Sequence, residues 1–234
     1  VMTDGEHILP FASSQDHKAR DNGDRGPNTG GMGAYSPAPV VTPELHDRVM
    51  AEVIEPTVRG LAAEGCRYVG FLYAGLMITA DGPKVLEYNC RLGDPETQPL
   101  LMRLRSDLVE LCKGALDGCL DQIPIDWDPR PALGVVMVAG GYPGRYRQGD
   151  IIQGLPAHND ELGDEVKLFH AGTAEAKDGH VVTHGGRVLC ATALGSTVAE
   201  AQNLAYNLVK RVHWDGVHYR TDIGYRAIAR ERGT

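Results

Sequence analysis

The chain has 234 residues, 42% hydrophobic and 23% charged, which is enough apolar material for a folded core and excludes wholesale disorder. Its 23 basic and 31 acidic side chains give a net charge of −8 at pH 7, which disfavours general nucleic-acid binding. No apolar run approaches the roughly 18–20 residues of a membrane span.

The cysteine content indicates the class of compartment. The five cysteines show no C-x-x-C spacing, which argues against a disulfide framework or a structural zinc site and is typical of a reducing cytosol. We expect all five to be small buried hydrophobic residues. They are Cys66, Cys90, Cys112, Cys119 and Cys190.

The first nine residues predict the end of one strand, a turn at Asp4-Gly5 and a second strand. Position 1 is Val, not Met, and the hairpin turn follows it almost at once. We therefore expect these residues to belong to a longer polypeptide.

Residues 11–39 are rich in turn formers, and a loop of that length is typically functional or disordered. Its glycine run, GPNTGGMG at 26–33, would let successive backbone N–H groups converge on an anion. The run is neither a P-loop nor G-x-G-x-x-G, and a flexible surface loop is the alternative. Just upstream, Asp16 and Lys18 either order a substrate or end a solvated strand.

The next hundred residues predict a helix, a hairpin and a second helix. The first helix begins at Thr42-Pro43, with Thr42 as N-cap, kinks at Pro56 and ends at Gly65. Strands are predicted over 68–79 and 84–90. A polar loop over 91–98 then leads into one helix over about 99–120.

Three prolines and three aspartates over 121–131 indicate a domain boundary, and we place the domains at 1–125 and 126–234. In the second part, the sequence predicts a helix that begins with a capping box at 197–200. Its predicted strands are 133–139, 166–170, 180–183 and 187–194.

Glu87 and Asn89 are two residues apart on a predicted strand, so their side chains share one face. Carboxylate and amide oxygens are hard ligands of the kind that suit Mg²⁺. The alternative is a solvent-exposed polar face between inward-pointing Leu86, Tyr88 and Cys90.

The loop after this strand carries charges of both signs. Arg91 has the geometry to bind a carboxylate or phosphate in bidentate fashion. Asp94 and Glu96 flank Pro95, which stiffens the loop. An ordinary turn that caps the next helix is the alternative, but the position directly after Glu87 and Asn89 favours a shared site.

Three stretches carry a family resemblance: SSQDHK at 13–18, GPNTGGMGAYSP at 26–37 and LEYNCRLGDPETQ at 86–98. They resemble motifs of the phosphoribosylamine–glycine ligase family, also called glycinamide ribonucleotide synthetase, in the ATP-grasp superfamily. Residues 133–149 and 219–224 are similar to the C-terminal domain of this family. The resemblance extends over essentially the whole chain.

The resemblance implies an α+β fold: an ATP-grasp core with an antiparallel or mixed sheet flanked by helices, then a small α+β C-terminal domain. It implies an ATP-dependent C–N ligase of de novo purine biosynthesis in the cytoplasm. Glycine would form a glycyl phosphate with ATP, and 5-phosphoribosylamine would displace phosphate to give glycinamide ribonucleotide. ATP is then a co-substrate and Mg²⁺ or Mn²⁺ the metal cofactor, with neither nucleic acid nor membrane as a partner.

The resemblance also implies roles for the strand and the loop after it. Glu87 and Asn89 correspond to the family's metal ligands, which bridge ATP phosphates. Arg91 corresponds to an arginine that faces the phosphates or the acyl phosphate. Asp94 and Glu96 belong to the signature loop, and we group them with Arg91 as candidate catalytic residues without assigning their chemistry.

Five further residues become candidates for substrate binding through the resemblance. Asp16 and Lys18 correspond to a segment near the phosphoribosylamine site. Gly30, Gly31 and Gly33 correspond to a loop over the reacting groups.

Family members carry an N-terminal domain and a small ATP lid before the part that this chain resembles. We expect both to be missing here, which makes that N-terminal lobe of the same polypeptide a required partner. Alone, this segment is expected to bind ATP weakly and to turn over slowly or not at all. The alternatives are a lidless, non-catalytic fragment that serves as an interaction or structural module, and another ATP-grasp carboxylate–amine ligase.

Overall fold

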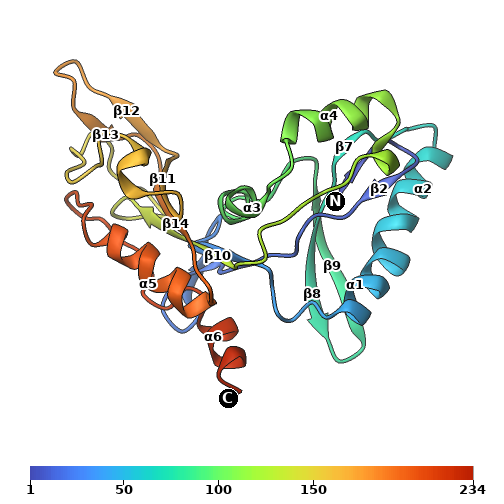
Figure 1. Cartoon of the computed structure of the whole chain (residues 1–234). Coiled ribbons are helices and arrows are strands. Elements are labelled where there is room, and N and C mark those ends of the chain that lie inside the picture. Colours follow the sequence, from blue (N-terminus) through green and yellow to red (C-terminus); the bar gives the residue numbers. More distant parts are fainter. Residues whose placement is uncertain (234) are drawn as a thin grey trace. The chain divides into compact units, whose positions relative to one another are not determined.

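The computed structural model describes residues 1–233, which form two compact units (Figure 1). Unit 1 comprises residues 1–13, 39–93 and 104–128, and unit 2 comprises residues 14–38, 94–103 and those from 129 onward. The units therefore alternate along the chain. The family domains whose boundary we place between 125 and 126 stay a prediction.

Unit 1 contains a small antiparallel sheet, a two-stranded ribbon and several helices. The sheet has the order β2–β1–β7, with β1 (Met2–Thr3), β2 (Ile8–Leu9) and β7 (Gly70–Phe71). The ribbon pairs β8 (Tyr73–Thr79) with β9 (Gly82–Asn89). The helical elements are α1 (Pro43–Val49), a π-helical turn (Met50–Ile54), α2 (Glu55–Ala63), α4 (Leu108–Asp117) and a 3₁₀ turn (Leu120–Gln122).

The start of the chain and of the first helix confirm the local predictions. β1 and β2 pair as an antiparallel hairpin around Asp4-Gly5. The Thr42 hydroxyl accepts a hydrogen bond from the Leu45 N–H at 3.2 Å, so Thr42 is the N-cap. The irregularity expected at Pro56 takes the form of the π-helical turn just before α2, since proline lacks the N–H that a continuous α-helix needs.

Unit 2 is built on a five-stranded antiparallel sheet of order β11–β14–β10–β6–β3. Its strands are β3 (Gln15–Asp16), β6 (Gly33–Ser36), β10 (Ala132–Val138), β11 (Val166–His170) and β14 (Arg187–Leu194). Two hairpins join β4 (Ala19–Asp21) to β5 (Arg25–Asn28) and β12 (Thr173–Glu175) to β13 (Val181–Thr183). The helices are α3 (Thr97–Arg103), a 3₁₀ turn (Asn159–Leu162), α5 (Val198–Val209) and α6 (Tyr225–Glu231).

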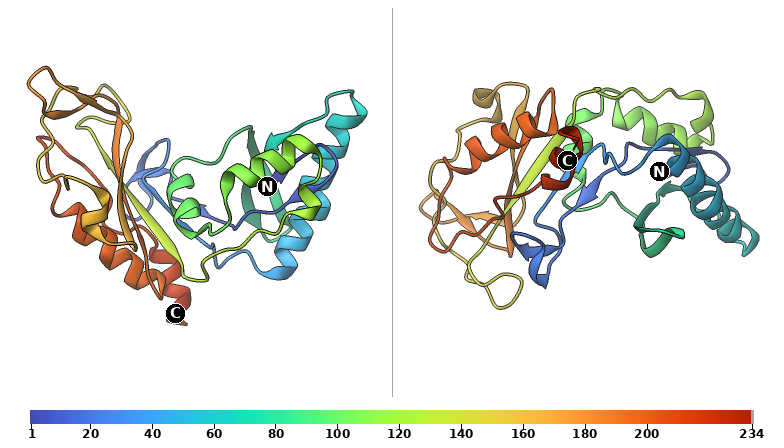
Figure 2. Two further views of the ribbon diagram at one scale, coloured as in Figure 1. Left: turned by 45° about the horizontal axis from the view of Figure 1, so that its top comes forward. Right: turned by 90° about the horizontal axis from the view of Figure 1, so that it is seen from below.

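The larger hydrophobic core lies in unit 2, around β10 and α5. Every residue of β10 is buried, because β14 and β6 pair with its two edges and α5 packs against the sheet (Figure 2). α5 begins where its capping box predicts, since the Thr197 hydroxyl accepts from the Glu200 N–H. The buried face of α5 includes Ala201, Ala205 and Leu208.

The prediction of a single helix over about 99–120 is wrong, because the structure has two helices there. α3 ends at Arg103 in unit 2, and α4 begins at Leu108 in unit 1. Asp107 starts the second helix, since its carboxylate accepts a hydrogen bond from the Val109 N–H at 2.7 Å. Leucines recur at helical spacing on both sides of the break, so the pattern of apolar residues did not reveal it.

Residues 11–39, expected as one long loop, contain the four short strands β3 to β6. β6 is fully buried and pairs with both β10 and β3. Glycine and proline are depleted in strands, so their abundance here concealed this pairing. β12 was likewise not predicted.

The cysteines confirm one expectation and contradict another. All five are free, so the described part of the chain holds no disulfide. Cys190 is buried, but Cys66 and Cys90 are exposed, contrary to expectation. Among residues 1–233, none of the helices combines the length and apolar character required to span a bilayer.

Candidate active site

The ten residues singled out from the sequence divide between the two units. Seven lie in unit 2: Asp16, Lys18, Gly30, Gly31, Gly33, Asp94 and Glu96. Three lie in unit 1: Glu87, Asn89 and Arg91. Each group has its own local geometry.

In unit 1, Glu87 and Asn89 occupy the end of β9, as predicted. They lie opposite Gly75 and Tyr73 of β8, in regular register, so their side chains share one face of the ribbon. A Cβ atom at Gly75 would lie 3.0 Å from Glu87 Cγ, so the glycine gives the carboxylate side chain its space. Arg91 follows in an exposed position, where Nη1 donates to the Leu92 carbonyl oxygen at 2.9 Å.

The three residues that alternate with these ligand candidates along β9 and just after it do not point inward. Leu86 is 64% exposed and Tyr88 43% exposed, and Cys90 is exposed as well. The alternative interpretation, a polar face between inward-pointing apolar residues, is therefore wrong, because β9 belongs to a two-stranded ribbon whose residues are exposed on both faces.

The donor set at Glu87 and Asn89 fits a magnesium ion that arrives with phosphate. Mg²⁺ characteristically takes one or two carboxylates and completes its shell with phosphate oxygens and water. Glu87 is exposed and Asn89 is partly exposed, so both oxygens are accessible at one strand end. No cluster of three or more His, Cys, Asp and Glu side chains within residues 1–233 is arranged to hold a metal ion.

In unit 2, Asp16 is a buried carboxylate at the end of β3. Its side chain is 7% exposed, and Lys18 Nζ lies 2.6 Å from Oδ2. Oδ1 has no hydrogen-bond donor among the described residues. Burial, and next the nearby Glu96 carboxylate, raise the pKa of Asp16 to about 7, against the opposing effects of Lys18 and of the His17 backbone N–H.

Gly31 brings Asp16 and the signature loop together. Its φ of +120° is unfavourable for other residues, and a Cβ atom there would collide with Pro95 Cδ and lie 2.7 Å from Asp16 Oδ1. Glu96 follows Pro95, is 3% exposed, and its carbonyl accepts from the Leu100 N–H in the first turn of α3. The structure therefore brings Asp16 and Gly31 close to the Pro95–Glu96 part of the signature loop.

The glycine run does not offer a set of N–H groups to an anion. Each N–H from 29 to 32 already has an acceptor within unit 2. The bonds are Thr29 to the Lys18 carbonyl at 2.8 Å, Gly30 to Tyr142 Oη at 2.9 Å, Gly31 to Thr29 Oγ1 at 2.9 Å and Met32 to the His17 carbonyl at 2.9 Å. Of the two interpretations of this run, the anion nest is therefore wrong for residues 29–32, and Gly33 lies inside β6 rather than in a loop.

Two residues that contact this region were not identified from the sequence. Arg187 Nη1 donates to the carbonyl oxygens of Gly30 and Asp94 at 2.9 and 2.8 Å, and Nη2 donates to Asp94 Oδ2 at 2.8 Å. Tyr142 accepts from the Gly30 N–H, as above. The available signal was an arginine at the first position of an otherwise almost entirely apolar strand, β14.

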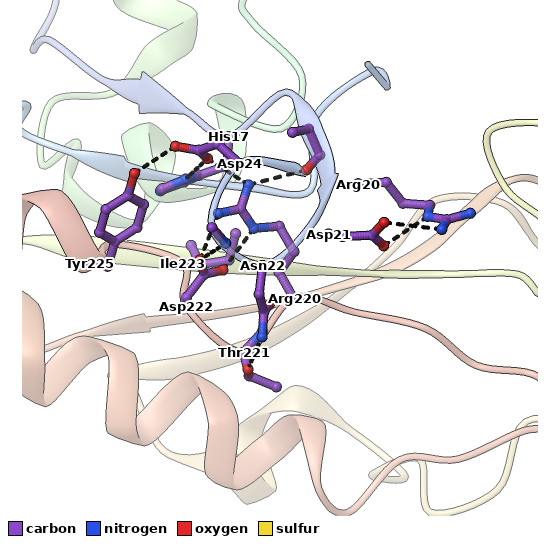
Figure 3. A network of polar contacts seen from close by, with 12 residues as sticks. His17, Arg20, Asp21, Asn22, Asp24, Arg220, Thr221, Asp222, Ile223 and Tyr225 are labelled. Atoms are coloured by element: carbon purple, nitrogen blue, oxygen red, sulfur yellow. Dashed lines mark hydrogen bonds and ion pairs between the residues drawn. The ribbon is translucent and has the colours of Figure 1, made fainter. Parts of the chain in front are cut away.

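A second polar network adjoins Asp16 through its neighbour His17 (Figure 3). The buried Arg220 guanidinium donates to the carboxylates of Asp222 (2.8 and 2.9 Å) and Asp24 (2.9 Å). His17 Nε2 accepts from the Gly224 N–H at 3.0 Å. Burial, and next the Arg220 charge, lower the pKa of His17 to about 4, so the ring is neutral at pH 7.

Comparison with known proteins identifies the family. Residues 1–97 match the model described as phosphoribosylglycinamide synthetase, ATP-grasp (A) domain, and residues 132–226 match that of its C domain. The sheet of unit 2 takes β3 and β6 from the first match and β10, β11 and β14 from the second.

The relatives carry the same name. The chain is 71% identical over 233 residues to the phosphoribosylamine–glycine ligase of Allochromatium vinosum and 66% identical to that of Vibrio vulnificus strain YJ016. These matches cover 99% of this chain but 54% and 53% of the relatives, so the chain spans about half the length of the curated relatives it matches.

The solved structures agree on the fold. The crystal structure of the phosphoribosylamine–glycine ligase of Thermotoga maritima has a TM-score of 0.82 and 38% identity, and the match covers 94% of this chain and 53% of that one. The urea carboxylase of Kluyveromyces lactis, at 15% identity and TM-score 0.63, matches 97% of this chain and 19% of its own and shares the fold alone. The α+β ATP-grasp fold class and the family resemblance are thus confirmed: the chain belongs to the phosphoribosylamine–glycine ligase family.

Proposed function

We propose that the protein ligates glycine to 5-phosphoribosylamine through a glycyl phosphate and releases glycinamide ribonucleotide, ADP and phosphate. The observation that carries this proposal is the 71% identity, over 99% of the chain, to a protein named phosphoribosylamine–glycine ligase. The protein is thereby an ATP-dependent C–N ligase, and ATP, glycine and phosphoribosylamine are its substrates.

The first half of this reaction brings a carboxylate to a polyphosphate, so negative charge has to be neutralised. Arg91, exposed at the end of β9, is assigned to the phosphates or to the acyl phosphate. Glu87 and Asn89 are assigned as ligands of Mg²⁺ or Mn²⁺, which neutralises phosphate charge when bound.

The second half requires an uncharged amine to attack the acyl carbon. Asp16 is assigned to the amine substrate because its buried carboxyl group has a raised pKa of about 7 and an oxygen that no protein donor occupies. A carboxylate in that state attracts an ammonium group and accepts a proton near neutral pH. The Glu96 carboxylate adds negative charge beside Asp16, and the Lys18 ammonium group neutralises part of that charge.

Of the remaining candidates, Gly31 lies next to this carboxylate. It is assigned to substrate contact because a Cβ atom there would meet Asp16 and Pro95. Gly30 precedes it, Gly33 follows in β6, and Asp94 anchors the neighbouring loop through Arg187.

The test is a coupled assay on the complete product of the gene. ADP release is expected to require glycine and phosphoribosylamine together, with glycinamide ribonucleotide identified by mass spectrometry. If another acid or amine supports turnover better, the protein is a different ATP-grasp ligase. If no acid and amine pair releases ADP, the proposed function is wrong.

A further inference from the structure

Gly30 is fixed through both of its backbone polar groups by side chains that are distant in sequence. Its N–H donates to Tyr142 Oη at 2.9 Å, and its carbonyl oxygen accepts from Arg187 Nη1 at 2.9 Å. Loop backbones on a protein surface are usually solvated, so two side-chain bonds to one exposed glycine are a specific anchorage.

Arg187 extends the anchorage to the signature loop. The same Nη1 donates to the Asp94 carbonyl oxygen, and Nη2 forms an ion pair with the Asp94 carboxylate, both at 2.8 Å. The Arg187 side chain is only 23% exposed. A planar guanidinium with several charge-assisted bonds holds its acceptors in one geometry, which a lysine ammonium does not reproduce.

The surrounding packing leaves this arrangement little freedom. A Cβ atom at Gly30 would lie 2.9 Å from Arg187 Cζ, so the loop lies directly against the guanidinium. Gly186, next to Arg187 in the chain, gives the Tyr142 ring its space, since a Cβ there would collide with that ring. Tyr142 therefore packs against the residue that precedes Arg187, and both side chains bond to Gly30.

The anchored glycine adjoins Gly31, which contacts Asp16 and Pro95. We propose that Arg187 and Tyr142 are positioning residues of the ligase: they hold the Gly30–Gly31 loop and the Asp94–Glu96 loop together and so place Asp16 and Glu96 for the amine substrate. This inference rests on the proposed function. It assigns two residues of the C-domain segment to the geometry of a site otherwise drawn from the ATP-grasp segment.

A direct role of Arg187 as a phosphate ligand fits less well. Its Nη1 and Nη2 atoms both donate to protein acceptors, and its ion-pair partner Asp94 offsets its charge. Positioning acts on the rate of the chemical step, because a displacement of about 1 Å can lower a rate roughly 100-fold.

The experiment compares variants of the complete gene product: Arg187→Gln, Arg187→Lys, Tyr142→Phe and, as a matched control, Arg147→Gln. Arg147 pairs with Asp150 and Asp215 at 2.8 and 2.6 Å but makes no bond to either loop. We expect kcat to fall on the order of 100-fold for Arg187→Gln, less for Arg187→Lys and about 3- to 10-fold for Tyr142→Phe. The control is expected to retain wild-type kcat, and KM for ATP is expected to change less than about threefold in every variant.

Amide hydrogen exchange gives a second readout that does not depend on turnover. We expect exchange at 29–33 and 93–96 to accelerate on the order of tenfold in both the Arg187 and the Tyr142 variants, and the rest of unit 2 to be unaffected. If Arg187→Gln fails to fold, Arg187→Lys and Tyr142→Phe carry the test.

Two results would overturn the inference in an active enzyme. Faster loop exchange with unchanged kcat would make the anchorage merely structural. A raised KM for glycine or phosphoribosylamine with unchanged kcat would make Arg187 a substrate ligand instead. A wild-type protein without ligase activity would contradict the proposed function itself, which separates the two failures.

Discussion

Two polar clusters of unit 2 meet at consecutive residues, Asp16 and His17, and they are organised in opposite ways. Around His17, the Arg220 guanidinium is matched by the carboxylates of Asp24 and Asp222. The imidazole accepts from a backbone N–H through Nε2, and its buried Nδ1 has no hydrogen-bond partner among the described residues. Around Asp16, a buried carboxylate faces a second one, Glu96, and one of its oxygens has no donor.

The same physical cause acts on both neighbours with opposite sign. Burial disfavours whichever form is charged, so it raises the pKa of Asp16 to about 7 and lowers the pKa of His17 to about 4. A matched network stabilises the fold, whereas a buried group without its partner costs stability and is retained where a ligand supplies the partner. Both clusters hold buried polar atoms without a hydrogen-bond partner, so the difference between them lies in their charges: opposite charges are matched around Arg220, whereas the Asp16 carboxylate lies near the like charge of Glu96. We therefore propose that the His17 side supports the fold and that the Asp16 side serves the chemistry.

The largest expected effect on stability comes from breaking the matched cluster, the ion pairs of Arg220 with Asp24 and Asp222. Arg220→Leu leaves the Asp222 carboxylate without its guanidinium and leaves Asp24 with the guanidinium of Arg226 alone, so we expect a loss of about 3–5 kcal/mol in the free energy of unfolding. Urea unfolding at pH 7 measures it. A loss below about 1 kcal/mol would show that the network does not support the fold. Exchanging Arg145, an exposed arginine of the same unit, for Leu is the control.

His17, which lies beside the matched cluster, makes the stability of the fold depend on pH. Its pKa of about 4 in the folded protein lies below the value of about 6.5 for an unfolded chain, so only the unfolded state binds a proton between these values. Stability is therefore expected to fall by about 2–3 kcal/mol from pH 7 to pH 4 through this group. The decrease between these two pH values should be smaller by that amount in His17→Gln, and equal decreases in both proteins would contradict the assignment.

A third expectation extends the comparison to unit 1. Glu87→Ala combined with Asn89→Ala is expected to weaken Mg–ATP binding on the order of 10- to 100-fold, and chelation of the metal should have the same effect on the wild type. Isothermal titration calorimetry on the complete gene product measures both. Glu110→Ala, which removes an exposed carboxylate paired with Lys113, is the control. Unchanged affinity without unfolding would remove these residues from the nucleotide site.

Local patterns in the sequence predicted much of what lies within one element. The shared face of Glu87 and Asn89 follows from strand periodicity, and the caps of α1 and α5 follow from Thr42 and Thr197. The family motifs also led to Asp16 and Glu96 as candidate site residues, and their roles stay predictions. Their juxtaposition did not follow from spacing, since it depends on how Gly31 and Pro95 pack.

Long-range contacts account for what the sequence did not predict. Arg187 lies 157 residues from Gly30 and 93 from Asp94, and no periodicity connects such positions. The break between α3 and α4 was missed because leucines continue through it, although Asp107 was an available N-cap signal. β6 was missed because its pairing with β10 overrides the weak strand propensity around it.

Asp16→Asn tests the contrast between the two clusters most directly. Because the folded pKa of about 7 exceeds the unfolded value of about 3.9, ionised Asp16 destabilises the fold increasingly from about pH 4 to pH 7. The variant removes that charge at a site without a donor for Oδ1. Asp21→Asn, which changes a half-buried carboxylate paired with Arg20, is the control.

The decisive measurement is the unfolding free energy at pH 8 together with the ligation rate of the Asp16→Asn protein. We expect stability to rise by about 1–3 kcal/mol and the rate to fall on the order of 100-fold, because a group retained for chemistry costs stability. A variant that ligates at the wild-type rate, or that is less stable than the wild type at pH 8, would contradict the assignment of Asp16 to the active site.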